Sequence, residues 1–106
     1  HMGIVLSVNP VLVAEARGTV RLLFLSDFHK ITQKGQRLSI RRFRNADLVK
    51  ELTHRQAELM DLFLSEFAGL EYDDKFLWNN FDTQGRQKLY CSEFVAKLLQ
   101  AFAGLE

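Results

Sequence analysis

The chain has 106 residues, of which 47% are hydrophobic and 25% are charged, and its formal net charge is +1. These values are typical of one small globular domain and give no strong electrostatic field for nucleic acid or an anionic membrane. The single cysteine excludes an internal disulfide framework. No apolar run approaches the roughly 18 residues that span a bilayer, and no signal peptide is visible.

The first part of the chain is rich in strand signals. Residues 3–8 and 11–16 predict two strands, joined as a hairpin by the turn signal Asn9-Pro10. After Gly18, residues 19–25 predict a further strand at the edge of the sheet. The pattern therefore starts with a small antiparallel sheet.

A mixed segment follows. Residues 26–31 predict a short helical turn, with Ser26 or Asp27 as its cap. Residues 32–36 predict a loop, and 37–43 a strand in which the basic run "RRFR" lies on a solvated face.

Helices dominate the second half. Apolar residues recur at helical spacing from 46 to 68, with Asn45 as the N-cap and Gly69 just past the end. An aromatic, mostly irregular segment and a short strand "KLY" then lead to a second helix over 92–103, ended by Gly104. Strands first and helices later predict an α+β domain.

Cys91 stands where the short strand becomes this last helix, and three interpretations are open. A free cysteine often serves as a small buried hydrophobe. Residues 82–93 can also be aligned with a calcium loop, although Gln84, Arg86 and Gln87 occupy positions that need two oxygen ligands and a glycine. Finally, a cysteine in the first helical turn can be a nucleophile, because the helix N-terminus favours a thiolate.

A nucleophilic cysteine requires a base, and the chain offers three histidines. His54 lies within the long helix and is expected on a solvated face. His29 lies in the turn after the strands, with Asp27 as its one nearby carboxylate. His1 stands at the head of the first strand, and the opening dipeptide His-Met is also typical of a cloning scar.

Four motifs, taken together, resemble one protein family. In chain order they are His1-Met2-Gly3-Ile4-Val5, "VAEA" at 13–16, Tyr72-Asp73-Asp74-Lys75-Phe76 and Tyr90-Cys91-Ser92-Glu93-Phe94-Val95. Their order and spacing resemble those of the permuted papain-like cysteine amidases of the NlpC superfamily, the YiiX-like proteins in particular. The last motif alone is moderately specific, whereas the four in order cover nearly the whole chain.

The resemblance implies that residues 1–106 form a single permuted papain-like hydrolase domain. Cys91 is then expected to be the nucleophile, His1 the general base and Glu15 the residue that holds the other imidazole nitrogen. Tyr90 and Tyr72 are expected to contact the substrate. Members of the family usually have another strand before the histidine strand, so the domain is expected to be incomplete at its N-terminus.

The expected reaction is hydrolysis of an amide through a thioester, with no metal or organic cofactor. The superfamily suggests peptides, cell-wall peptides or lipid-linked amides as substrates, in a bacterial cell whose envelope is one open location. No nucleic-acid partner and no stable membrane insertion are expected. The main alternative is a non-catalytic binding or assembly module of the same fold, and a degenerate, metal-free calcium-loop protein is a remote one.

Overall fold

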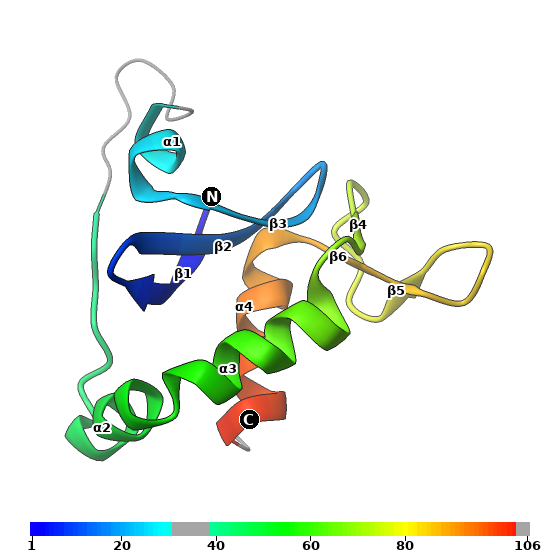
Figure 1. Cartoon of the computed structure of the whole chain (residues 1–106). Coiled ribbons are helices and arrows are strands. Elements are labelled where there is room, and N and C mark those ends of the chain that lie inside the picture. The colour runs from blue at the N-terminus through cyan, green and yellow to red at the C-terminus, as the bar shows by residue number, and fades with distance from the viewer. Residues whose placement is uncertain (31–38, 104–106) are drawn as a thin grey trace.

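The computed structural model describes residues 1–30 and 39–103. Within these residues, six strands form one sheet in the order β1-β2-β3-β4-β6-β5 (Figure 1). The strands are β1 (Gly3–Val8), β2 (Val11–Arg17), β3 (Thr19–Phe24), β4 (Glu71–Tyr72), β5 (Asn80–Phe81) and β6 (Gln87–Leu89). Every neighbouring pair is antiparallel except β4 and β6, which are parallel. The predicted α+β class with a small, mainly antiparallel sheet is confirmed.

The first two strands form the predicted hairpin. Val8 pairs with Val11 across the Asn9-Pro10 turn, and Gly3 pairs with Glu15 at the far end. The register shifts between Val5 and Ser7. The bulge lets Leu6 enter the core, where it is 1% exposed.

The predicted edge position of the third strand is wrong. β3 pairs with β2 along its whole length and with β4 through Thr19 and Glu71. It ends one residue earlier than expected, because Leu25 already begins helix α1 (Leu25–Lys30). Ser26 and Asp27 therefore lie inside this helix, and the prediction that one of them caps it is also wrong.

The strand predicted for 37–43 is not found in the part that is described. Residues 39–43 have no regular structure and are exposed. Residues 37–38, the loop predicted for 32–36 and the helix end predicted at Gly104 lie outside the described residues. The basic run is solvated as expected, without being part of a strand.

The helix predicted over 46–68 begins as expected but is not continuous. The Asn45 side chain accepts hydrogen bonds from the N–H groups of Asp47 and Leu48, which confirms the N-cap. Helix α2 (Ala46–His54) then ends at Arg55, whose backbone leaves the helical region at φ −107° and ψ 31°. Helix α3 (Gln56–Leu62) starts directly afterwards.

The last turn of this helical region is a π-helix, η1 (Phe63–Phe67). Ala68 N–H donates to the carbonyl of Phe63, 2.9 Å away. In an α-helix, Phe67 would lie about 40° further around the helix axis than Phe63, because four residues exceed one turn of 3.6 residues. The π-helical turn holds more residues, so it brings the two side chains onto the same face. Phe63 and Phe67 are thereby both buried, and Gly69 follows at φ 86°, which confirms the predicted helix end.

The core lies between this helix and helix α4 (Cys91–Ala103), on one face of the β1–β3 sheet (Figure 1). Phe94 of α4 is fully buried and contacts Phe63 and Phe67 edge to face, with ring centroids 5.9 Å apart in both pairs. Ala14 and Ala16 of β2 let the helices approach the sheet closely. This packing fixes the start of α4 relative to the sheet.

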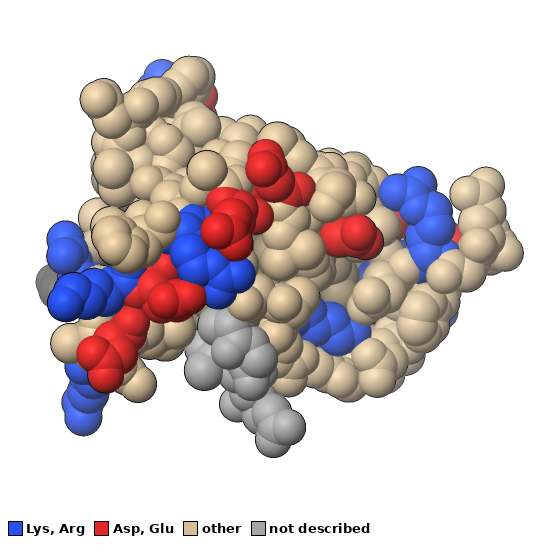
Figure 2. Space-filling view, turned by 60° about the horizontal axis from the view of Figure 1, so that its bottom comes forward, with Lys and Arg blue, Asp and Glu red and all other residues tan. Residues whose placement is uncertain are grey.

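Charged groups of both signs are interspersed over the face that includes α2 and α3, as Figure 2 shows. Arg55, at the junction of these helices, pairs with Glu51 at 2.8 Å and with Glu58 at 3.0 Å. In the described ranges, no helix has the length and apolar character needed to cross a membrane.

Candidate active site

His1 and Glu15 meet at one end of the β1–β2 hairpin. The Nε2 atom of His1 lies 2.5 Å from Oε1 of Glu15. The Glu15 side chain is fully buried, whereas the His1 side chain is 24% exposed. The His1 ring also stacks on Phe28 of α1, with ring centroids 5.8 Å apart. The imidazole is thus held at its Nε2 atom and on one flat side.

Two arginines also lie beside the Glu15 carboxylate. Arg21 donates from Nε to Oε2 at 2.8 Å, and its Nη2 lies 2.7 Å from the same oxygen. Arg17 is more distant, with Nε 3.9 Å from Oε1. Each oxygen of this buried carboxylate therefore has its own partner, as a buried charge requires.

Cys91 is the first residue of α4 and is half-buried. The first helical hydrogen bond runs from Phe94 N–H to the Tyr90 carbonyl at 2.9 Å. The N–H groups at the start of a helix lack partners within the helix, and they point toward its N-terminal end. Such donors favour a thiolate and can stabilise an oxyanion.

Three aromatic side chains gather beside Cys91. Burial, and then the negative charges of a Cys91 thiolate and of Asp73, raise the pKa of Tyr72 above its ordinary value. Tyr72 contacts Phe76 edge to face at 6.2 Å, and Phe76 contacts Tyr90 at 5.8 Å between ring centroids. Phe76 is 61% exposed, so these contacts leave an exposed aromatic surface next to Tyr72 and Tyr90.

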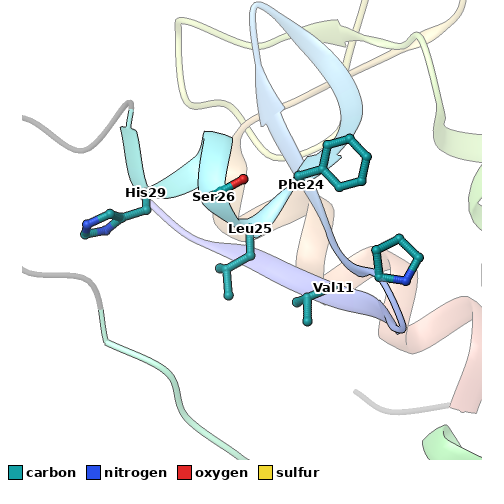
Figure 3. Close-up of a pocket in the computed structure, with 6 residues that line it drawn as sticks. Val11, Phe24, Leu25, Ser26 and His29 are labelled. Atoms are coloured by element: carbon teal, nitrogen blue, oxygen red, sulfur yellow. The ribbon is translucent and has the colours of Figure 1, made fainter.

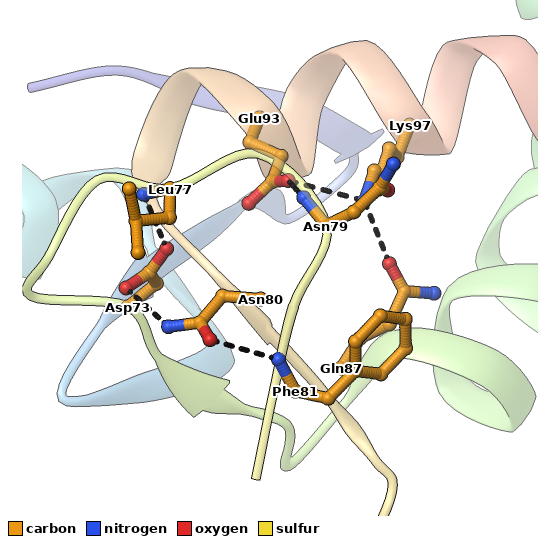
Figure 4. Close-up of polar contacts among 8 residues, drawn as sticks. All are labelled: Asp73, Leu77, Asn79, Asn80, Phe81, Gln87, Glu93 and Lys97. Atoms are coloured by element: carbon orange, nitrogen blue, oxygen red, sulfur yellow. Dashed lines mark hydrogen bonds and ion pairs between the residues drawn. The ribbon is translucent and has the colours of Figure 1, made fainter.

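Asp73 anchors the loop that carries Phe76 (Figure 4). Its Oδ1 accepts from Lys75 N–H and from the Asn80 amide, both at 3.0 Å, and its Oδ2 accepts from Leu77 N–H at 2.8 Å. Burial alone would raise the pKa of this carboxyl, but these hydrogen bonds outweigh burial and lower it. These bonds brace the loop, in which Phe76 has a φ of 55°, a value that residues other than glycine rarely adopt.

Glu93 joins the same loop to α4 (Figure 4). Its Oε2 accepts from Asn79 N–H at 2.9 Å and lies 3.1 Å from Lys97 Nζ, while its buried Oε1 has no hydrogen-bond partner. Lys97 also donates to the side chains of Asn79 at 2.7 Å and Gln87 at 2.8 Å. Glu93 is fully buried, so it anchors this loop to the first turn of α4.

The predicted site residues are brought together in two groups. His1 and Glu15 form one, while Tyr72 and Tyr90 stand with Cys91 in the other. Among the described residues, no hydrogen bond joins Cys91 to His1. Arg17 connects the groups electrostatically, since it lies 3.9 Å from Glu15 and its charge also acts on Tyr72.

The other histidines stand apart from both groups. His54 is exposed, as expected. His29 lies on the rim of an open apolar pocket of about 460 Å³ at the turn beside α1 (Figure 3). The pocket is lined by Pro10, Val11, Phe24, Leu25, Ser26 and His29, and the lining includes neither Cys91 nor His1.

The calcium-loop alternative is not supported by the local fold. A helix–loop–helix needs a helix before Asp82, and strand β5 stands there instead. Asp82 Oδ1 accepts from the N–H groups of Gln84 and Arg86, so it closes a tight turn. Across residues 1–30 and 39–103, no three His, Cys, Asp or Glu side chains form a group that could hold a metal ion.

Sequence reasoning missed Arg21 and Lys97. The chain reverses at Gly18, so residues equally far from Gly18 face each other in the β2–β3 hairpin, and this relation pairs Glu15 with Arg21. Lys97 stands four residues after Glu93, the spacing at which charged side chains meet on a helix. Both partners were thus present as spacing signals in the sequence.

One family model matches the chain over residues 1–106, and its description is permuted papain-like amidase enzyme, YaeF/YiiX, C92 family. Neither the curated proteins nor the solved structures give a significant match. The family match covers the strand that follows His1, the strand of Glu15 and the helix that begins at Cys91.

Proposed function

The chain belongs to the permuted papain-like amidase family that includes YaeF and YiiX, and on that premise we propose that it is a cysteine amidase. Cys91 is the nucleophile, His1 the general base and Glu15 the residue that orients the imidazole. The observation that carries this assignment is the 2.5 Å contact between His1 Nε2 and the buried Glu15 carboxylate. A base needs such an orienting partner to present its other nitrogen to a nucleophile.

In the proposed reaction, His1 Nδ1 takes the proton of the Cys91 thiol, and the sulfur attacks the amide carbonyl carbon. The carbonyl oxygen becomes an oxyanion, which the free N–H groups at the start of α4 stabilise. When the C–N bond breaks, the imidazolium returns the proton to the leaving amine and a thioester remains. A water molecule, deprotonated by His1, then attacks the thioester, and release of the acid restores the thiol.

The substrate is proposed to be a peptide or another amide with an apolar group near the scissile bond. Tyr72 and Tyr90 are assigned to its binding because both stand beside Cys91, and Phe76 links their rings. The exposed side of Phe76 offers apolar area to a ligand. Cell-wall peptides and lipid-linked amides both fit this description. The rates of hydrolysis of a panel of such amides would distinguish the two substrate classes.

The assignment is tested by the rate at which iodoacetamide labels Cys91 between pH 5 and 10. An ordinary thiol, with a pKa of about 8.5, reacts little below about pH 7. We expect Cys91 to be labelled there in the unaltered chain, and His1→Ala and Glu15→Gln to abolish this low-pH labelling. His54→Ala, which alters an exposed histidine, is the matched control.

A labelling rate that follows an ordinary thiol and does not respond to His1→Ala would contradict the proposal. That outcome would favour the non-catalytic binding module of the same fold. Hydrolysis of an amide that is lost in Cys91→Ser and kept in His54→Ala would support the enzyme and identify its substrate class.

A further inference from the structure

We propose that Arg21 is a positioning residue for the His1–Glu15 pair, an inference that rests on the proposed function. Arg21 contacts neither Cys91 nor His1 in the described hydrogen bonds and ion pairs. Its role is to hold the Glu15 carboxylate in one orientation, so that the carboxylate in turn fixes the imidazole of His1.

The carboxylate of Glu15 has no access to water, so its charge and both oxygens depend on protein partners. Arg21 presents Nε and Nη2 to Oε2, at 2.8 and 2.7 Å. Both donors of the rigid guanidinium plane meet this one oxygen, so Oε2 is held from two directions, whereas a lysine ammonium would supply a single point contact. Oε1 is thereby left facing His1 Nε2.

The backbone makes this arrangement rigid. Glu15 and Arg21 are direct partners in the register of β2 and β3, with ladder pairs on both sides. Side chains directly opposite each other in an antiparallel pair have their Cβ atoms about 5 Å apart. Arg17 does not stand opposite Glu15, since it is on the same strand and pairs with Thr19. Its Nε lies 3.9 Å from Oε1, which is beyond hydrogen-bond distance. Arg17 is therefore the natural control.

The electrostatic consequence has a definite sign. Removal of a positive charge next to the pair stabilises its protonated state, whether the proton is bound to His1 or to Glu15. Arg21→Gln should therefore raise the pKa of the His1 imidazole. A residue that merely supported the strand would not move this pKa selectively.

The primary experiment is an NMR titration of the three histidine rings in the intact chain, with His1→Ala used to assign the His1 signal. We expect Arg21→Gln to raise the pKa of His1 and to leave His29 and His54 unchanged. Arg21→Lys, which retains the charge, should keep the pKa near its original value. A His1 shift in Arg21→Gln no larger than that in Arg17→Gln would overturn the proposal.

Labelling of Cys91 by iodoacetamide at pH 6.5 then tests orientation separately from charge. Arg21→Lys keeps one donor of the fork, so the labelling rate should fall about tenfold although the pKa of His1 is kept. A full rate in Arg21→Lys would overturn the orienting role. The proposed function fails separately, if His1→Ala leaves the labelling of Cys91 unchanged in the chain that retains Arg21.

Discussion

Replacement of Asp73 by asparagine should weaken the fold by removing one charge-assisted hydrogen bond and a buried negative charge. Asparagine is the closest match in shape, but it offers only one acceptor oxygen. If that oxygen takes the place of Oδ1, it keeps the contacts with Lys75 and Asn80, and the amide NH₂ then faces the N–H of Leu77. Two donors then face each other without water.

The magnitude follows from these three contacts. Hydrogen bonds to a charged group contribute about 1.5–3 kcal/mol each, and neutral ones about half as much. Loss of the Leu77 bond and weakening of the other two should therefore lower the free energy of unfolding by about 3 kcal/mol. Asp74→Asn changes the same side chain one residue later, at an exposed site, and should stay within about 0.5 kcal/mol.

The effect depends on pH with a definite sign, since the pKa of Asp73 is lowered in the folded protein. The stabilisation is complete above the unfolded pKa of about 3.9 and is lost as the pH falls through the folded value. The difference in unfolding free energy between the original chain and Asp73→Asn should thus be largest near neutral pH. It should shrink below about pH 4.

Urea unfolding, followed by circular dichroism and by the fluorescence of Trp78, measures both effects. Trp78 lies in the loop that Asp73 anchors and is 49% exposed, so its emission reports on this loop. Equal unfolding midpoints for Asp73→Asn and Asp74→Asn at pH 7 would refute the reasoning. So would a difference between the original chain and Asp73→Asn that does not change between pH 7 and pH 3.

Two further predictions concern buried charge and close packing. Lys97→Met leaves the buried carboxylate of Glu93 without its cation and should cost about 3 kcal/mol in thermal unfolding. Glu93→Gln added to it should recover part of the loss, and the exposed Lys50→Met should cost little; equal losses at the two lysines would contradict this. Gly3→Ala should cost about 1–3 kcal/mol in urea unfolding, because its Cβ would lie 2.7 Å from Cγ1 of Val13. An unchanged midpoint would contradict this prediction, because it would mean that the added Cβ is accommodated without loss of free energy.

Features fixed by local chemistry were predictable from the sequence. The Asn9-Pro10 turn, the Asn45 cap and the Gly69 helix end depend on one or two residues and their backbone preferences, and all three are found. The pairing of His1 with Glu15 followed from the hairpin together with the resemblance. The catalytic roles of these residues and of Cys91 stay predictions.

Features fixed by distant contacts were not predictable. The helix breaks at Arg55 although no glycine or proline marks the site, and the next residue, Gln56, donates from its side chain to the Leu6 carbonyl of β1 at 3.0 Å. Such a tertiary hydrogen bond outweighs helix propensity, which is a small effect per residue. The alternation around Ile40 likewise suggested a strand, but alternation alone does not supply a partner to pair with.

The bulge in β1 has a consequence for self-association. β1 stands at the end of the sheet formed by the described residues, and an exposed strand edge can template pairing with another chain. The ladder on β1 is regular over Gly3–Val5 and resumes only at Ser7. A strand that paired with this edge would therefore find only the three residues Gly3–Val5 in one register, because the bulge at Leu6 shifts the register of the rest of β1. This interruption disfavours the long, uniform ladders on which fibrous aggregates grow.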